Sequence, residues 1–125
     1  MTVDTRRKIV TLERARELAR ERKASGERVI AFVSYFEVMR AAHVRRLEEL
    51  GPGTLFAVLT EPPSPLVALD ARAEVVAGLR RVDYVVVGPE EDAVAAIEPT
   101  VRVDDEAEDR ERTRELMDHV RSRGK

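Results

Sequence analysis

Few residues in this chain could carry out chemistry. Cysteine is absent, which excludes a thiolate nucleophile, a disulfide and a cysteine-based metal site. The two histidines are His43, near the start of a predicted helix, and His119, which stands alone on a highly charged segment and is expected to be exposed and inert. Arg40 lies just before His43, and its guanidinium could hold a phosphate through two hydrogen bonds. The sequence shows no Ser/His/Asp order and no cluster of metal ligands, so no metal is expected.

The apolar pattern places these residues in an α/β fold. Segments with a helical period alternate with short continuous apolar runs, which are typical of buried parallel strands. Strands are expected at 28–33, 55–59, 84–87 and 100–103, and helices at about 12–25, 40–50, 70–80 and 91–97. Thr11 and Asp70 are expected to cap the first and third helices, and Gly26 to end the first. The three prolines of 61–65 predict a loop.

The last segment, 104–125, is mostly charged and is expected to form one more helix. Oppositely charged residues recur at helical spacing in the pairs Glu108/Arg112, Glu111/Arg114 and Asp118/Arg121. A narrow apolar stripe is formed by Thr113, Leu116, Met117 and Val120. Three arrangements fit this pattern: the helix packs back on the sheet, it contacts a partner helix or a second copy, or the segment is disordered.

The bulk composition indicates a small globular protein. Its 125 residues, 43% hydrophobic and 37% charged, fit one α/β domain at 1–103 followed by the helix at 104–125. The 22 basic and 24 acidic residues are interspersed, which predicts no nucleic-acid partner. No window approaches the roughly 20 apolar residues of a membrane span, and the N-terminus lacks the apolar stretch of a signal peptide. We therefore expect a cytoplasmic protein without membrane contact.

Three stretches of the sequence carry a family resemblance. Residues 7–13 (RKIVTLE) look like the lead-in to a nucleotidylyltransferase domain of the ADP-heptose synthase type, in the cytidylyltransferase-like superfamily. Residues 36–44 (FEVMRAAHV) resemble the family pattern F-D-L-L-H-x-G-H-V. Residues 72–86 (RAEVVAGLRRVDYVV) are similar to R-A-E-x-x-A-x-L-x-x-V-D-Y-V-V, the longest and most specific of the three matches. The resemblance covers roughly residues 7–103.

The resemblance implies a Rossmann-like open parallel sheet of about four strands, flanked by helices. Numbering the four expected strands along the chain, the implied order is 3-2-1-4. The site would lie at the carboxyl ends of the strands, near the switch point between strands one and four. The implied reaction is attack by a substrate phosphate on the α-phosphate of a nucleoside triphosphate, with release of pyrophosphate. The family's two motif histidines assist by stabilising charge on phosphate oxygens at a helix start.

Most of the residues that carry this chemistry are replaced. The first motif histidine is Arg40, which can bind phosphate but lacks the imidazole shape, and the motif glycine is Ala42, which narrows the approach to the backbone. The second histidine is retained as His43. Its functional interpretation is a phosphate ligand and the one catalytic candidate; the structural interpretation is a remnant that packs or caps the helix start.

Further candidates follow from the same comparison. The family's T-N-G-C stretch is Phe32–Tyr35, where Ser34 replaces the turn glycine and the aromatic rings at its two ends could fill the nucleotide space. Glu37 conservatively replaces the family's aspartate. Arg72 matches a family position, where it could be a structural salt-bridge partner or an anion contact. Ser34, Glu37, Arg40, His43 and Arg72 are therefore the phosphate- or nucleotide-binding candidates.

The later elements of the family's site are missing. The loop after residues 59–61 (LTE) lacks the expected basic residues, because no Lys or Arg occurs between Arg46 and Arg72. The family's K-G-G-D-Y stretch is replaced by the acidic run 102–106 (RVDDE), and the final Ser/Thr-rich motif is absent. An acidic run beside a triphosphate would repel it.

These replacements predict a degenerate nucleotidylyltransferase-like domain without transferase activity, which acts by binding or association and needs no cofactor. One alternative is a divergent active enzyme that transfers a nucleotidyl group from ATP or CTP to a phosphorylated small molecule, with Mg²⁺ accompanying the nucleotide. The other is a non-catalytic module that holds a nucleotide or phosphate anion at Arg40 and His43. A homodimer is also expected, because strand 100–103 would otherwise present an open sheet edge; the helix at 104–125 is expected to contribute its stripe to the contact or to cover that edge.

Overall fold

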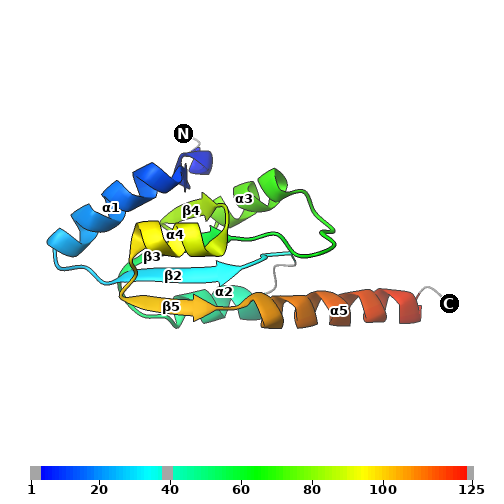
Figure 1. Cartoon of the computed structure of the whole chain (residues 1–125). Coiled ribbons are helices and arrows are strands. Elements are labelled where there is room, and N and C mark those ends of the chain that lie inside the picture. The colour runs from blue at the N-terminus through cyan, green and yellow to red at the C-terminus, as the bar shows by residue number, and fades with distance from the viewer. Residues whose placement is uncertain (1–3, 38–40, 124–125) are drawn as a thin grey trace.

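The computed structural model describes residues 4–37 and 41–123 (Figure 1). A short 3-10 helix at Thr5–Lys8 precedes the first strand. The strands are β1 (Ile9–Val10), β2 (Val29–Ser34), β3 (Thr54–Leu59), β4 (Tyr84–Val87) and β5 (Val101–Asp104). The α-helices are α1 (Leu12–Ala24), α2 (Ala41–Glu48), α3 (Leu69–Ala77), α4 (Glu90–Ile97) and α5 (Glu106–Arg123). Helix and strand thus alternate along the chain, as the sequence pattern predicts.

The strands form one parallel sheet with the order β1-β4-β3-β2-β5. The four strands expected from the sequence follow the predicted order 3-2-1-4. The prediction of about four strands is wrong in one detail, because Ile9–Val10 adds a fifth strand beside β4. This strand has only two residues and lies between a 3-10 turn and a helix, so it is too short to show a strand period.

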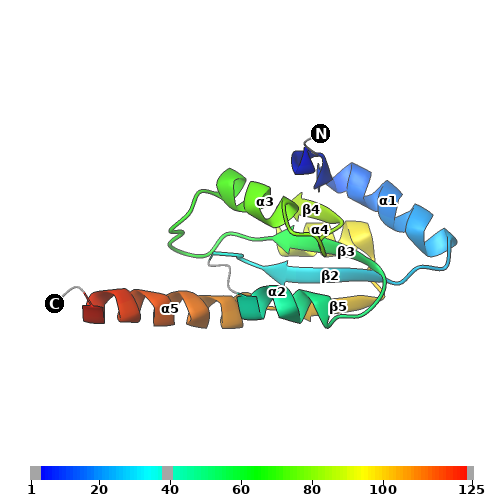
Figure 2. The ribbon, with the colours of Figure 1, turned by 180° about the vertical axis from the view of Figure 1, so that it is seen from behind.

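Each face of the sheet carries its own hydrophobic core. Helices α2 and α3 cover one face and α1 and α4 the other, as the two opposite views show (Figures 1 and 2). Successive residues of β2 alternate between the cores: Ile30 and Phe32 pack toward α2 and α3, whereas Ala31 and Val33 pack toward α1 and α4. Because both faces are buried, every residue of β2 and β3 is buried.

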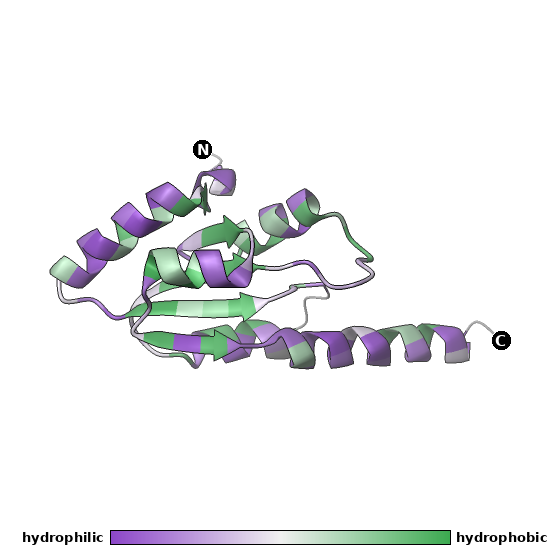
Figure 3. Cartoon of the chain, in the orientation of Figure 1, coloured by the Kyte–Doolittle hydropathy of each residue, from purple (hydrophilic) through white to green (hydrophobic). Residues whose placement is uncertain are grey.

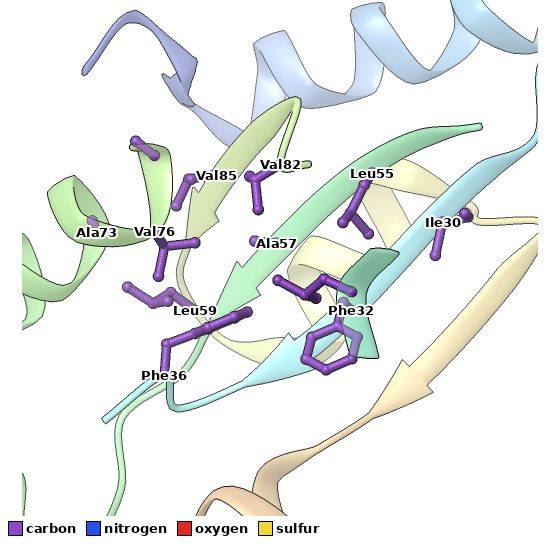
Figure 4. Close-up of a cluster of buried hydrophobic side chains, with 12 residues drawn as sticks. Ile30, Phe32, Phe36, Leu55, Ala57, Leu59, Ala73, Val76, Val82 and Val85 are labelled. Atoms are coloured by element: carbon purple, nitrogen blue, oxygen red, sulfur yellow. The ribbon is translucent and has the colours of Figure 1, made fainter. Parts of the chain in front are cut away.

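The core under α2 and α3 contains most of the larger apolar side chains (Figure 4). Phe36 closes this core at the carboxyl end of β2 and lies 5.7 Å from the ring of Phe32, measured between ring centroids. Coloured by hydropathy, the strands are mainly hydrophobic and α5 is mainly hydrophilic (Figure 3). Within the described ranges, no helix combines the length and apolar character needed to cross a bilayer.

The predicted helix ends are confirmed in two cases and wrong in one. Thr11 caps α1, since its side chain accepts a hydrogen bond from the backbone N–H of Arg14 at 3.1 Å. Gly26 follows the end of α1 with a φ of +84°, in the left-handed region that glycine favours. Asp70 does not cap α3: the N-cap is Ala68, and Asp70 already lies inside the helix. The extended backbone after the prolines therefore leads into α3 without a side-chain cap.

Helix α5 forms as predicted but extends past the end of β5 instead of turning back along it (Figures 1 and 2). The Glu111–Arg114 pair forms. The predicted pair of Glu108 with Arg112 does not form, because Glu108 contacts Arg46 of α2 and Arg112 turns toward buried carboxylates. Tertiary partners thus replace the local i,i+4 pair at the start of the helix.

Candidate functional site

The carboxyl ends of β2 and β5 meet at the predicted switch point of the sheet. β2 pairs with β3 on one side and with β5 on the other, so the chain segments that leave β2 and β5 lie together. The start of α2 and the first turns of α5 join them there. This is the position at which open α/β sheets bind ligands.

Asp105, directly after β5, is the centre of the site and is fully buried. Its backbone N–H donates to the carbonyl of Val33 at 2.7 Å, which extends the pairing of β5 with β2. Its carboxylate accepts a hydrogen bond from the hydroxyl of Ser34 at 3.0 Å and lies 3.4 Å from Nε2 of His43. Two candidates from the sequence, Ser34 and His43, are therefore brought together by one carboxylate.

Two arginines neutralise the buried carboxylates of the site. Arg46 of α2 donates to Asp105 at 3.0 Å and also contacts Glu108. Arg112 of α5 donates to Asp105 and lies 3.3 Å from Asp109. Buried carboxylates are stable only when they are paired and hydrogen-bonded, so these guanidinium groups are part of the fold of the site.

Asp109 lies one turn after Asp105 and is also fully buried. Its carboxylate accepts a hydrogen bond from the backbone N–H of Glu37 at 3.0 Å, which ties the first turns of α5 to the segment after β2. Burial raises the pKa of Asp109 above its ordinary value, while the hydrogen bond from Glu37 and the charge of Arg112 act in the opposite direction.

His43 is enclosed by aromatic rings as well as by Asp105. It is only 1% exposed. Its ring stacks on Phe36, with ring centroids 5.2 Å apart and planes 7° from parallel, and Phe32 lies 5.8 Å away in a tilted arrangement. Phe36 holds this position with a φ of +49°, a left-handed conformation that is strained for a bulky residue. This packing favours the structural interpretation of His43 over a phosphate ligand.

Glu37 and Arg72 both organise the proline loop that follows β3. The Glu37 carboxylate accepts from the backbone N–H groups of Leu66 and Val67, at 2.7 and 3.3 Å. Arg72 is 2% exposed. Its guanidinium donates to the backbone carbonyls of Val67, Tyr35 and Thr60 and to the carboxylate of Glu61. Of the two interpretations of Arg72, these contacts favour the structural salt bridge, because the guanidinium is already used by protein groups.

Arg40 lies outside the described residues, as does the side chain of Ala42. The structure therefore places four of the five candidate binding residues. The buried pair Asp105 and Asp109 is surrounded by Ser34, Glu37 and His43. Arg72 lies apart from this pair, under the proline loop.

The sequence indicated the acidic run 102–106, which includes Asp105, but not that Asp105 and Asp109 are buried together or that arginines pair with them. The expectation of no ligand cluster is corrected, because His43, Asp105 and Asp109 bring one possible ligand atom each to within 4.8 Å of one another. Arg46 and Arg112 occupy the same carboxylates, so guanidinium groups already supply the positive charge in this cluster. The one available signal was the spacing of two aspartates four residues apart, directly after a strand.

Two hollows flank the site at the same end of the sheet. The first, about 510 Å³, lies between the proline loop and α5, and its wall includes Tyr35, Pro62 and Arg110. The second, about 480 Å³, is acidic, with Glu61, Glu90 and Glu106 in its wall. The pKa of Glu90 is raised above its ordinary value, mainly by burial and to a lesser extent by the neighbouring carboxylates of Asp104 and Glu106. The acidic hollow is thus unsuited to a triphosphate.

Comparison with known proteins supports the resemblance read from the sequence. No family model matches the chain. The chain is 33% identical over 89 residues to the bifunctional protein HldE of Haemophilus ducreyi. This match covers 62% of this chain and 19% of that protein. It is 37% identical over 81 residues to the protein of the same name from Chromohalobacter salexigens, covering 56% of this chain and 17% of the relative. The chain thus spans less than a fifth of the curated relatives it matches. Both matches confirm the resemblance to proteins of the ADP-heptose synthase type and support a nucleotidylyltransferase-like domain.

Proposed function

We propose that this nucleotidylyltransferase-like domain has no transferase activity and acts by binding or association. The observation that carries the proposal is the burial of His43. The retained motif histidine is 1% exposed, stacked on Phe36 and 3.4 Å from the carboxylate of Asp105. A histidine that stabilises charge on a phosphate must face the space that the phosphate enters.

The charges around His43 also argue against phosphate binding at this position. Two buried carboxylates, Asp105 and Asp109, lie beside the carboxyl ends of β2 and β5, the end of the sheet at which the resemblance implies a site, and like charges repel most strongly in a site with little water. The nearby guanidinium groups of Arg46 and Arg112 are engaged by these carboxylates. Phosphate binding would need both carboxylates to lose these partners or the first turns of α5 to leave.

The test compares nucleotide binding with turnover on the full chain. ATP and CTP, each with Mg²⁺, are added in a thermal-shift assay and in calorimetry, and pyrophosphate release is followed with heptose-1-phosphate or glycerol-3-phosphate. A ligand at a hundredfold excess over its dissociation constant stabilises a protein by about 2.7 kcal/mol, so binding would be visible. We expect neither stabilisation nor release.

Each alternative function has its own outcome in this test. Stabilisation by a nucleotide without pyrophosphate release would favour the non-catalytic binding module. Release clearly above that of a folded His43→Ala variant would favour the divergent active enzyme and would overturn the proposal.

We further propose a cytoplasmic homodimer in which residues 1–103 form the α/β domain and 104–125 the attached helix. Its support is the position of β5 at one edge of the sheet, where α5 runs on past the strand. A second copy could pair along this edge. Sedimentation of the full chain as a monomer at micromolar concentration would exclude the homodimer without affecting the question of catalysis.

A further inference from the structure

Helix α5 presents a surface that the rest of the described chain does not cover. Its first turns are held by Asp105 and Asp109, whereas its second half extends beyond the sheet (Figures 1 and 2). The stripe of Thr113, Leu116, Met117 and Val120 begins half-buried and ends exposed, with Val120 57% accessible. A contiguous apolar stripe that continues onto a protruding helix is available for contact with a partner.

The stripe leads into the first hollow. Thr113 belongs both to the stripe and to the wall of the 510 Å³ hollow, whose opposite wall is formed by Pro62 and Pro63 of the proline loop. Leu66, farther along that loop, is 55% exposed. A rod-shaped partner lying along the stripe would therefore reach this hollow at the base of α5, whose wall combines the prolines with charged side chains, among them Glu37, Arg110 and Arg114.

The charges beside the stripe indicate what kind of partner fits. With 3.6 residues per turn, Arg110, Arg114 and Arg121 fall along one side of the stripe and Arg123 along the other. The acidic side chains of this stretch, Glu111, Glu115 and Asp118, fall on the face of the helix opposite the stripe, although Glu111 also contributes to the wall of the first hollow. Pairing two copies through this stripe would set arginines against arginines, which is unfavourable.

We infer that α5 and the hollow at its base bind an amphipathic helix of a partner protein whose narrow apolar seam is flanked by carboxylates. Three large apolar side chains make a seam of coiled-coil width, narrower than the broad apolar face of a helix that lies on a membrane. The inference rests on the proposed role in association and names the chemistry of the partner. The homodimer proposed above uses the β5 edge, which leaves this stripe free.

The test uses two synthetic helical peptides and the full chain. Both peptides carry leucine and isoleucine at the seam positions; one has glutamate and the other lysine at the flanking positions. Fluorescence anisotropy should show binding of the glutamate peptide, weakening as salt is raised, and no binding of the lysine peptide. Val120→Asp should weaken binding by roughly tenfold or more. Ser122→Asp, which adds the same charge on the opposite face, should leave it unchanged.

A charge reversal makes the test independent of stability. Arg114→Glu combined with Arg121→Glu should shift the preference to the lysine peptide, with the helix content of the protein unchanged by circular dichroism. Equal binding of both peptides, or of neither, would overturn the inference. So would binding to anionic phospholipid vesicles in place of the peptides, or a dimer that Val120→Asp dissociates. None of these outcomes depends on nucleotide binding, so they are distinguishable from failure of the proposed function.

Discussion

At the scale of single residues, His43 has the surroundings of a core side chain, although the family resemblance matches it to a motif histidine. We expect His43→Ala to lower the free energy of unfolding by about 2–4 kcal/mol, because it removes a stacked ring and leaves the buried carboxylate of Asp105 with one partner fewer. Urea unfolding measures the loss, and His119→Ala on the exposed face of α5 is the control, expected to match the wild type. A His43→Ala protein of unchanged stability would contradict the packing role.

Asp109 makes the stability of the protein depend on pH in the acid range. Burial raises its pKa in the folded state above the ordinary 3.8, so the folded protein keeps this proton at pH values where the unfolded chain has lost it. Its contribution to stability therefore falls as pH rises from about 3.8 through the raised folded value, and is constant outside that window.

The matching measurement is chemical unfolding of the wild type and of Asp109→Asn at a series of pH values. The wild type should lose stability relative to the variant as pH rises through this window. The opposite trend would mean that the hydrogen bond from Glu37 and the charge of Arg112 outweigh burial.

At the scale of elements, the turn before β3 depends on a glycine. Gly53 has a φ of +138°, and a Cβ added there would lie 2.7 Å from the backbone oxygen of Arg28. Because backbone cannot move aside cheaply, Gly53→Ala should cost about 2–4 kcal/mol of stability. Gly26→Ala is the matched comparison: φ is +84° but the added Cβ meets nothing within 4 Å, so only the cost of the backbone conformation, about 1 kcal/mol, is expected. Equal melting temperatures for the two variants would contradict the expected clash between a Cβ at residue 53 and the backbone oxygen of Arg28.

At the scale of the whole molecule, α5 has a docked base and a protruding remainder that should differ in their effect on stability. Deleting residues 104–125 removes both buried aspartates, leaves Arg46 and His43 without their carboxylate partners, and should lower the melting temperature strongly or cause aggregation. Deleting only residues 115–125 keeps Asp105, Asp109 and Arg112 and should leave the melting temperature close to that of the full chain. Thermal unfolding with light scattering compares the two truncated proteins. A 1–103 fragment as stable as the full chain would show that α5 does not stabilise the fold.

Much of the fold could be predicted because its signals are local. The continuous apolar run of β2 and the hydroxyl of Thr11 before an amphipathic segment act within a few residues of themselves. The resemblance of residues 72–86 to a known pattern then indicated the strand order. The two-residue strand β1 was missed because it is too short for any period. The cap assigned to Asp70 was wrong because α3 already begins at Leu69, which places Asp70 in its first turn, and no side chain caps the helix.

The sequence by itself determined the alternation of helices and strands and the existence of α5, and its resemblance to a known family indicated the order of the four longer strands. Only the tertiary structure decided the state of the candidate site. Ser34 and Asp105 are 71 residues apart along the chain and hydrogen-bond because β2 and β5 are neighbours in the sheet. Whether His43 faces a ligand or a core depends on such long-range packing, since the same side chain binds phosphate in an open pocket and stacks on Phe36 in a closed one. Local periodicity carries no information on whether His43 is open or enclosed, because the residues that enclose it come into contact only in the folded sheet.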